Sequence, residues 1–177
     1  MNNRRERDGE EKILEFLLDY PTKGVSQAEI VRVLKLPAST VSVVLERLVD
    51  KFKWIISDRV GNTYQYKLDL VNPVARQYKK LRVVKQLWLA IEELQLVSRR
   101  VILFGSAGEG KSIEGSDIDV FVESGDKELV KKIMNKFENL PVRWIVKNTR
   151  ETVQLQQEDP VFYDEVFNRG EVLWERE

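Results

Sequence analysis

The sequence of 177 residues contains no cysteine and no histidine. Without cysteine the protein has no disulfide and no thiolate metal site, and without histidine it lacks the commonest metal ligand and acid–base group of proteins. Any catalysis must therefore depend on carboxylates, hydroxyls, lysine or a bound ion. No apolar run approaches the ~18 residues of a membrane span, and the polar opening Met-Asn-Asn-Arg-Arg-Glu-Arg-Asp predicts no signal peptide. We therefore expect a cytoplasmic protein with no membrane partner.

Neither sign of charge is in excess, because 29 lysine and arginine residues balance 29 aspartate and glutamate residues. The balance changes along the chain. Residues 1–70 have 12 basic and 11 acidic side chains, residues 71–100 have 7 and 2, and residues 101–177 have 10 and 16. The length permits two small domains. We expect a first domain over residues 1–70, a helical connector over 71–98 and a second domain over 99–177.

Residues 1–70 predict three helices and a β-hairpin. Apolar residues recur at helical spacing over residues 10–20, after the capping-box sequence Ser26-Gln27-Ala28-Glu29, and after Pro37. Two β-rich runs, residues 54–59 and 63–68, flank a Gly61-Asn62 turn signal. This pattern resembles the winged helix-turn-helix domain that is common among prokaryotic transcription regulators.

The resemblance implies binding of double-stranded DNA, with the third helix in the major groove and the hairpin at the phosphate backbone. The candidate DNA-binding residues are Ser39, Thr40, Ser42, Val43, Arg47, Lys53 and Arg59. A net charge of only +1 over residues 1–70 leaves a second interpretation open, in which this domain is a dimerisation or protein-docking module.

Residues 71–98 predict one long helix or two, with a basic first half. That half is suited to a nucleic-acid backbone or an acidic partner, and the alternative is a solvated helix face. Trp88, together with Leu87 and Ile91, is interpreted as core or as the seam of a homodimer.

The stretch from Val101 to Val122 contains the residues best suited to chemistry. A strand over 101–104 leads into Gly105-Ser106, ten residues follow, and then Asp117-Ile118-Asp119 opens a second strand. Two aspartates one residue apart on a strand point to the same face. Mg²⁺ is usually held by one or two carboxylates plus phosphate oxygens, and a glycine permits close approach of the backbone to a phosphate.

Beyond residue 122 the pattern predicts a helix over 126–139 capped near Ser124, a strand over 142–146, a short helix over 160–168 and a strand over 172–174. The second domain is thus a small α/β domain with a mixed sheet, and the whole chain is of the α+β class. Phe104-Gly105-Ser106 together with Ser116-Asp117-Ile118-Asp119-Val120 resembles the active-site signature of the nucleotidyltransferase superfamily that includes DNA polymerase β. The likeness is to its minimal, antitoxin-like prokaryotic branch.

That resemblance implies transfer of a nucleoside monophosphate from an NTP, usually ATP, with Mg²⁺ or Mn²⁺ as the metal and pyrophosphate as the leaving group. Asp117 and Asp119 would be the catalytic, metal-binding residues. The nucleotide-binding candidates are Gly105, Ser106, Lys111 and Ser116.

Two positions depart from the family pattern. Arg143 occupies the place of a third carboxylate, and Ala107 stands where members often have an arginine, for which Lys111 is the candidate substitute. Three functions therefore stay open: a nucleotidyltransferase linked to a DNA-binding regulator, a nucleotide-responsive regulator with impaired catalysis, and an antitoxin-like protein that modifies a partner protein or toxin.

Overall fold

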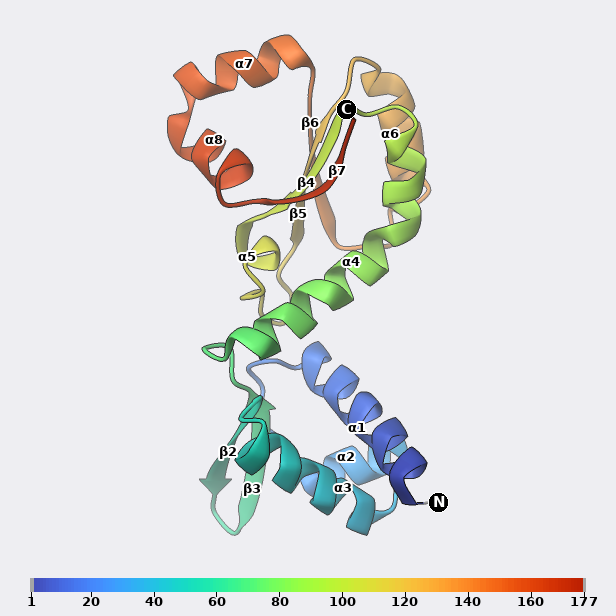
Figure 1. The fold of residues 1–177 in the computed structure, drawn as a ribbon, viewed down its shortest axis with the longest axis vertical. Coiled ribbons are helices and arrows are strands. Elements are labelled where there is room, and N and C mark those ends of the chain that lie inside the picture. Colours follow the sequence, from blue (N-terminus) through green and yellow to red (C-terminus); the bar gives the residue numbers. More distant parts are fainter. Residues whose placement is uncertain (1, 177) are drawn as a thin grey trace. The chain divides into compact units, whose positions relative to one another are not determined.

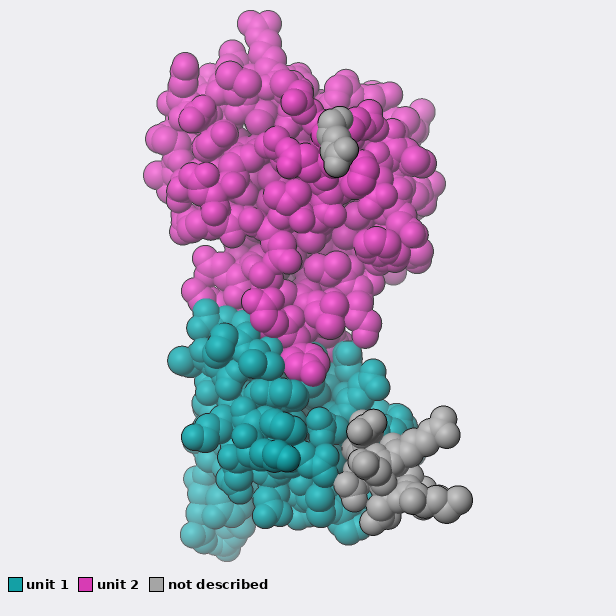
Figure 2. Space-filling view, viewed as in Figure 1, with its two compact units in different colours: residues 1–76 teal, residues 77–177 magenta. Residues whose placement is uncertain are grey.

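The computed structural model describes residues 2–176, with side chains from residue 8 onward. The chain divides into two compact units, residues 1–76 and residues 77–177 (Figure 2). Helix α4 (Pro73–Gln95) runs across this division, and most of it is counted with the second unit. No helix among the described residues is both long and apolar enough to span a bilayer.

The first unit consists of three helices, a π-helical turn and a small sheet (Figure 1). Its elements are α1 (Asn2–Asp19), β1 (Val25–Ser26), α2 (Gln27–Leu34), α3 (Ala38–Glu46), η1 (Arg47–Lys51), β2 (Ile55–Val60) and β3 (Thr63–Leu68). The strands lie in the order β1-β3-β2, and both pairings are antiparallel. The predicted helices and hairpin are confirmed, and β1 is an addition that the sequence did not predict.

Local sequence explains where these elements begin and end. Ser26 caps α2, because its Oγ accepts a hydrogen bond from the Glu29 backbone N–H at 3.2 Å. Gly61 has φ +60° in the turn between β2 and β3, the left-handed conformation that glycine adopts at low cost. The apolar faces of the three helices meet the inner face of the sheet in one core. Its fully buried members include Ile13, Leu17, Ile30, Val41, Val44 and Leu48.

The second unit is a four-stranded mixed sheet with helices on both faces (Figure 1). Its elements after α4 are β4 (Arg100–Phe104), α5 (Gly105–Gly108), β5 (Ile118–Glu123), α6 (Lys127–Asn135), β6 (Val142–Lys147), α7 (Thr149–Glu158), α8 (Pro160–Phe167) and β7 (Glu171–Glu175). The strand order is β6-β5-β4-β7. β5 and β6 are parallel, and the other two pairings are antiparallel.

Two hydrophobic clusters cover the two faces of this sheet. Residues of α4 and α6 pack on the face that includes Val101, Leu103 and Val120. Residues of α7 and α8 pack on the face that includes Phe104 and Phe121. Since side chains alternate along a strand, Asp119 and Glu123 share the face of Phe121. Both carboxylates therefore lie on the α7–α8 side of the sheet.

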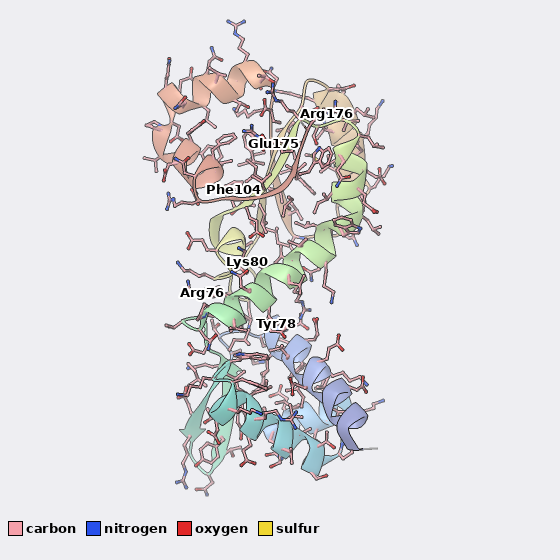
Figure 3. The ribbon with its side chains drawn as sticks, in the orientation of Figure 1. Arg76, Tyr78, Lys80, Phe104, Glu175 and Arg176 are labelled. Atoms are coloured by element: carbon pink, nitrogen blue, oxygen red, sulfur yellow. The ribbon has the colours of Figure 1, made fainter. Side chains whose placement is uncertain are left out.

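Helix α4 is attached to the second unit by apolar and ionic contacts. Lys80, labelled in Figure 3, forms an ion pair with Glu171 of β7, and Lys136 bonds to Glu93 at 2.5 Å. Leu87 and Ile91 are fully buried in the second unit's core, as one of the two interpretations required. Trp88 is 48% exposed, so its assignment to the core is wrong: it points away from the buried face of the helix.

Other parts of the second unit also differ from the sequence prediction. Helix α6 ends at Asn135 rather than near residue 139, and its cap is Asp126, whose carboxylate accepts from the Leu129 N–H. Ser124 instead accepts from the Asp126 N–H. The sequence prediction missed α7 entirely and predicted a loop where α5 forms a single helical turn.

Candidate metal and nucleotide site

The turn after β4 is built around the absence of a side chain at residue 105. Gly105 has φ +63°, which is strained for any residue with a Cβ. A Cβ placed there would lie 2.7 Å from Asp119 Oδ2. Two independent features therefore require glycine at this position. One is the positive φ angle, and the other is the Asp119 carboxylate, which leaves no space for a Cβ. The structure thus brings the Gly-Ser turn and Asp119 into contact.

Asp119 is the second residue of β5, where its register partners are Phe104 on β4 and Arg143 on β6. Its side chain is only 16% exposed. Asp117 is exposed and precedes the strand, which begins at Ile118. The expectation that both aspartates lie on a strand is thus wrong for Asp117, because strand pairing with β6 starts one residue later.

Arg143 forms an ion pair with Asp119, with its Nε 2.6 Å from Asp119 Oδ1. Arg143 is 62% exposed, so the pair is open to solvent on the guanidinium side. The strand register places Arg143, the residue found where a third carboxylate was expected, directly beside Asp119. One metal-binding candidate is therefore already matched with a cation.

In the loop between α5 and β5, two of the candidate nucleotide-binding residues form contacts within the loop itself. Ser116 Oγ accepts from the Ile113 N–H at 3.0 Å, which shapes the turn before Asp117. Lys111 Nζ lies 2.6 Å from Glu109 Oε2, and its backbone N–H donates to the carbonyl of Ser106. Ser106 is exposed. Ser106 is thus the candidate whose hydroxyl is most accessible to a ligand, whereas Ser116 stabilises the loop.

The donor set suits a hard cation that keeps part of its hydration shell. Two carboxylates, those of Asp117 and Asp119, lie at the start of β5. Within residues 8–176, no group of three acidic, histidine or cysteine side chains is placed to hold a metal alone. Mg²⁺ commonly uses one or two carboxylates together with substrate phosphates. Asp117 and Asp119 therefore fit a metal that arrives with a nucleotide better than one bound permanently by protein alone.

The predicted DNA-binding residues do not all share one surface. Ser39, Ser42 and Val43 are exposed on α3, and Lys53 and Arg59 are exposed beside the hairpin. Thr40 instead packs against α1, since a Cβ on Gly9 would lie 3.1 Å from its Cγ2. Arg47 forms an ion pair with Glu10 at 2.9 Å. Thr40 and Arg47 are thus directed toward α1, a contact that the sequence pattern alone does not show.

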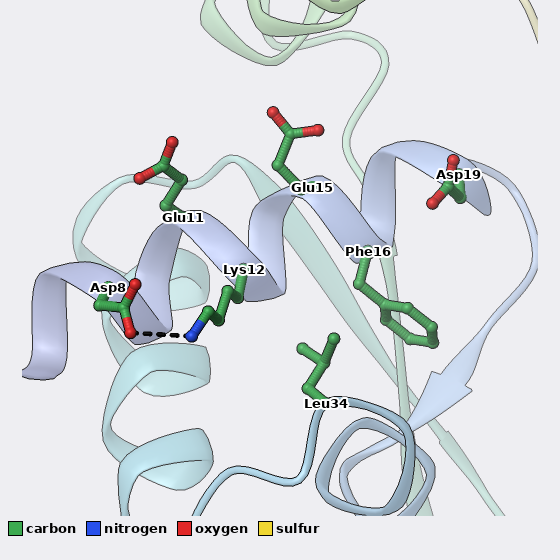
Figure 4. A pocket seen from close by; sticks show the side chains of 7 residues that line it. All are labelled: Asp8, Glu11, Lys12, Glu15, Phe16, Asp19 and Leu34. Carbon is green, nitrogen blue, oxygen red and sulfur yellow. Dashed lines mark hydrogen bonds and ion pairs between the residues drawn. The ribbon is translucent and has the colours of Figure 1, made fainter.

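A pocket of about 420 Å³ lies along α1 (Figure 4). Four acidic residues one helical turn apart line it, and Phe16 and Leu34 form its apolar part. The acidic residues are Asp8, Glu11, Glu15 and Asp19. With Lys12, paired with Asp8, as the one basic residue of the lining, this surface is acidic overall and disfavours phosphates.

A family model matches part of the second unit. The family model described as "Polymerase beta, Nucleotidyltransferase" matches residues 93–177. No curated protein matches the chain. Among solved structures, the chain is similar to one described as a "putative nucleotidyltransferase from Sulfolobus solfataricus", with 22% identity, a TM-score of 0.41, and coverage of 57% of this chain and 87% of that chain. The family match supports a polymerase β-like nucleotidyltransferase domain over residues 93–177.

Proposed function

We propose that the second unit is a metal-dependent nucleotidyltransferase. It would transfer a nucleoside monophosphate from an NTP, with ATP as the expected donor, to an acceptor hydroxyl. The observation that best supports this function is the contact between the Gly105 turn and Asp119. It puts the Asp119 carboxylate directly against a glycine, whose backbone has no side chain of its own. A metal-bound triphosphate needs both features at one place.

In the proposed reaction the acceptor oxygen forms a bond to the α-phosphorus. The bond from that phosphorus to the oxygen bridging the β-phosphate breaks, and pyrophosphate leaves. Asp117 and Asp119 would hold Mg²⁺ or Mn²⁺, which supplies charge neutralisation to the phosphates when bound. Gly105 admits the triphosphate close to the main chain, and the Ser106 hydroxyl donates to a phosphate oxygen.

The acceptor proton needs a destination, and Arg143 cannot provide it. A guanidinium stays protonated at any physiological pH, so Arg143 does not act as a general base. The proton would pass to water or to a group of the acceptor itself. Transfer is therefore expected to be slow unless the acceptor is already acidic.

The ion pair between Arg143 and Asp119 favours a second candidate function. In this alternative the domain binds a nucleotide without transferring it, and binding displaces Arg143 from Asp119 onto a phosphate. The chain would then be a nucleotide-responsive regulator. Arginine is well suited to phosphate, since its planar fork matches two phosphate oxygens.

We further propose that residues 10–69 are a winged helix that binds DNA through α3 and the hairpin. Three helices followed by an antiparallel β2–β3 hairpin support this interpretation. The chemistry of α3 limits the affinity, because Ala38–Glu46 contains no lysine or arginine. Lys53 and Arg59 are then the principal phosphate contacts.

Incubation with labelled NTPs, Mg²⁺ or Mn²⁺ and cell extract tests transfer directly. The wild-type chain is expected to label an acceptor, and the Asp117→Asn/Asp119→Asn double variant is expected not to. A matched control, Glu114→Gln in the same loop, should retain labelling. Metal-dependent NTP binding without any labelling would favour the nucleotide-responsive regulator, and neither binding nor labelling would refute both candidates.

A further inference from the structure

A second pocket lies at the opposite end of β5 from Asp119. It has a volume of about 190 Å³ and is bordered by the start of β4, the end of β5 and helices α7 and α8. Its lining residues are Arg99, Arg100, Glu123, Thr149, Thr152, Val153, Gln156 and Tyr163. Glu123 follows Asp119 by four residues, about 13 Å along a strand. The pocket is therefore separate from the proposed metal and nucleotide site.

Glu123 is the only carboxylate in this lining, and it is almost completely buried, at 3% exposure. Its register neighbours are Arg100 on β4 and Lys147 on β6. Arg100 is already bound by Glu175, labelled in Figure 3, with its Nε 2.8 Å from Glu175 Oε1. Across the described part of the chain, no side chain forms a hydrogen bond or ion pair with the Glu123 carboxylate.

Thr152 is a second polar group in the lining without a partner. The residue is 7% exposed, and its Oγ1 has no hydrogen-bond partner among the described residues. Its backbone N–H donates to the carbonyl of Asn148 at 2.9 Å, as helix geometry requires. A helical threonine can satisfy its hydroxyl on the carbonyl four residues earlier, and Thr152 does not do so.

The Glu123 carboxylate receives no hydrogen bond or cation from the described side chains, and neither of its oxygens is among the fully buried atoms that lack a partner, so it can be reached from the pocket. A ligand with a positively charged nitrogen would supply both. A metal ion is a poor match, since a single carboxylate cannot hold one and no cluster of three metal-ligating side chains exists in residues 8–176. The cation that fits Glu123 is therefore an organic ammonium group.

The rest of the lining favours an anion beside that ammonium. Arg99 presents an exposed guanidinium for which the described residues provide no side-chain partner. Thr149 and Thr152 lie in the first turn of α7, where the helix dipole favours negative charge. Val153 and Tyr163 add an apolar wall. A ligand with adjacent positive and negative groups and a modest side chain would match all of these features.

The size of the pocket narrows the class of ligand further. A pocket of about 190 Å³ holds the volume of about six water molecules at ~30 Å³ each, and it is smaller than the ~300 Å³ at which typical ligand sites begin. That is too small for a nucleotide and suits a small metabolite. We propose that this pocket binds a free α-amino acid, with the ammonium group on Glu123 and the carboxylate on Arg99 beside Thr152.

The proposal is tested by calorimetry on the full chain, titrating each of the twenty common amino acids at millimolar concentration. At least one should bind saturably. Glu123→Gln should weaken that binding at least tenfold, and Thr152→Val should weaken it several-fold. Glu158→Gln at the far end of α7 should bind normally. Asp117→Asn should also bind normally, which keeps this test independent of the proposed transferase function.

Chemical variants of the bound amino acid test each charged contact. The N-acetyl derivative and the amide of the carboxylate should both bind at least tenfold more weakly. Equal binding of either derivative, equal binding by Glu123→Gln, or no binding by any amino acid would overturn the proposal.

Folding of the test variant provides a separate check. Replacing an unpaired buried carboxylate by its neutral isostere is expected to leave the Tm unchanged or raise it. A lower Tm for Glu123→Gln without ligand would mean that Glu123 has a partner within the protein, which would also overturn the proposal.

Discussion

Asp119 contacts two groups that have opposite effects on a metal site. One is the glycine turn at Gly105, and the other is the guanidinium of Arg143. At the turn, the Asp119 carboxylate lies against a backbone that carries no side chain of its own. The guanidinium competes with any metal for the same carboxylate. Since an ion pair with one exposed partner contributes only ~0–1 kcal/mol, a divalent cation can replace it. Arg143 would thus raise the metal concentration that the site requires without abolishing binding.

Arg143→Ala is expected to lower the Mg²⁺ concentration needed for half-maximal NTP binding by up to about fivefold, which corresponds to ~1 kcal/mol. Calorimetric titration with a non-hydrolysable ATP analogue measures this. Arg150→Ala, an exposed arginine on α7, is the control and should leave the midpoint unchanged. If Arg143→Ala instead weakens nucleotide binding, Arg143 contacts phosphate rather than competing with the metal.

Gly105→Ala is expected to destabilise the protein by ~1–2 kcal/mol, because alanine at positive φ is strained, and its Cβ would displace Asp119. Metal-dependent nucleotide binding should be lost as well. Denaturant unfolding and nucleotide titration are the two measurements. Gly125→Ala is a matched control, since no atom lies within 4 Å of a Cβ at that position. Equal stability of the two variants would contradict the account of this turn.

At this scale the sequence motif identified the residues but not their partners. The order of Gly105-Ser106 and Asp119 between apolar strands was sufficient to place them together. Nothing in the sequence indicates that Ser116 accepts a hydrogen bond from the Ile113 N–H or that Lys111 pairs with Glu109. Such contacts depend on the path of the loop.

Among the elements, helix α7 shows best why part of the fold was missed. Only Thr152 and Leu155 of its ten residues are buried, so it has little apolar periodicity to detect. Its signal is the capping box at the start: Asn148 accepts from the Glu151 N–H, and Glu151 accepts from the Asn148 N–H. Helix α3, by contrast, has a buried apolar face of Val41, Val44 and Leu45, and its periodicity predicted the helix.

Glu151 also makes α7 sensitive to acid. The hydrogen bond from Lys127, followed by the one from the Asn148 N–H, lowers the pKa of the Glu151 carboxyl below its ordinary value. A lowered pKa in the folded state means that the ionised form stabilises folding. This contribution is complete above the unfolded pKa of about 4.3 and is lost as the pH falls through the lower, folded pKa.

Glu151→Gln is therefore expected to lower the Tm at neutral pH by a small amount and to approach the wild-type Tm as the pH falls below about 4. Thermal unfolding followed by circular dichroism over a pH series measures the difference. Glu158→Gln, at the other end of the helix, should show no such convergence. A difference that is independent of pH would contradict the assigned role of the Lys127 pair.

For the whole molecule, the two units differ in how strongly their function is supported. The second unit has a family match and a site with a consistent geometry. The first unit has a fold compatible with a winged helix, an acidic face along α1 and an α3 without basic residues. The near-zero net charge of residues 1–70 had already indicated, from the sequence, that the support for DNA binding is weaker.

DNA binding by the full chain is accordingly expected to be weak and to fall with salt. Lys53→Ala/Arg59→Ala should reduce the slope of log K against log salt by about 2, since each phosphate contact contributes ~0.9. Filter binding or fluorescence anisotropy with a random duplex provides the slopes. Lys12→Ala, on the acidic face of α1, is the control. An affinity that does not change with salt would exclude the proposed phosphate contacts.

The most direct test of the central claim is metal-dependent binding of a non-hydrolysable ATP analogue to the full chain, compared between the wild type and Asp117→Asn/Asp119→Asn. We expect saturable binding by the wild type that requires Mg²⁺ or Mn²⁺ and is lost in the double variant, while both proteins keep the same far-UV circular dichroism. Binding that is equal in the two proteins, or absent from the folded wild type with both metals, would contradict a metal and nucleotide site at Asp117 and Asp119.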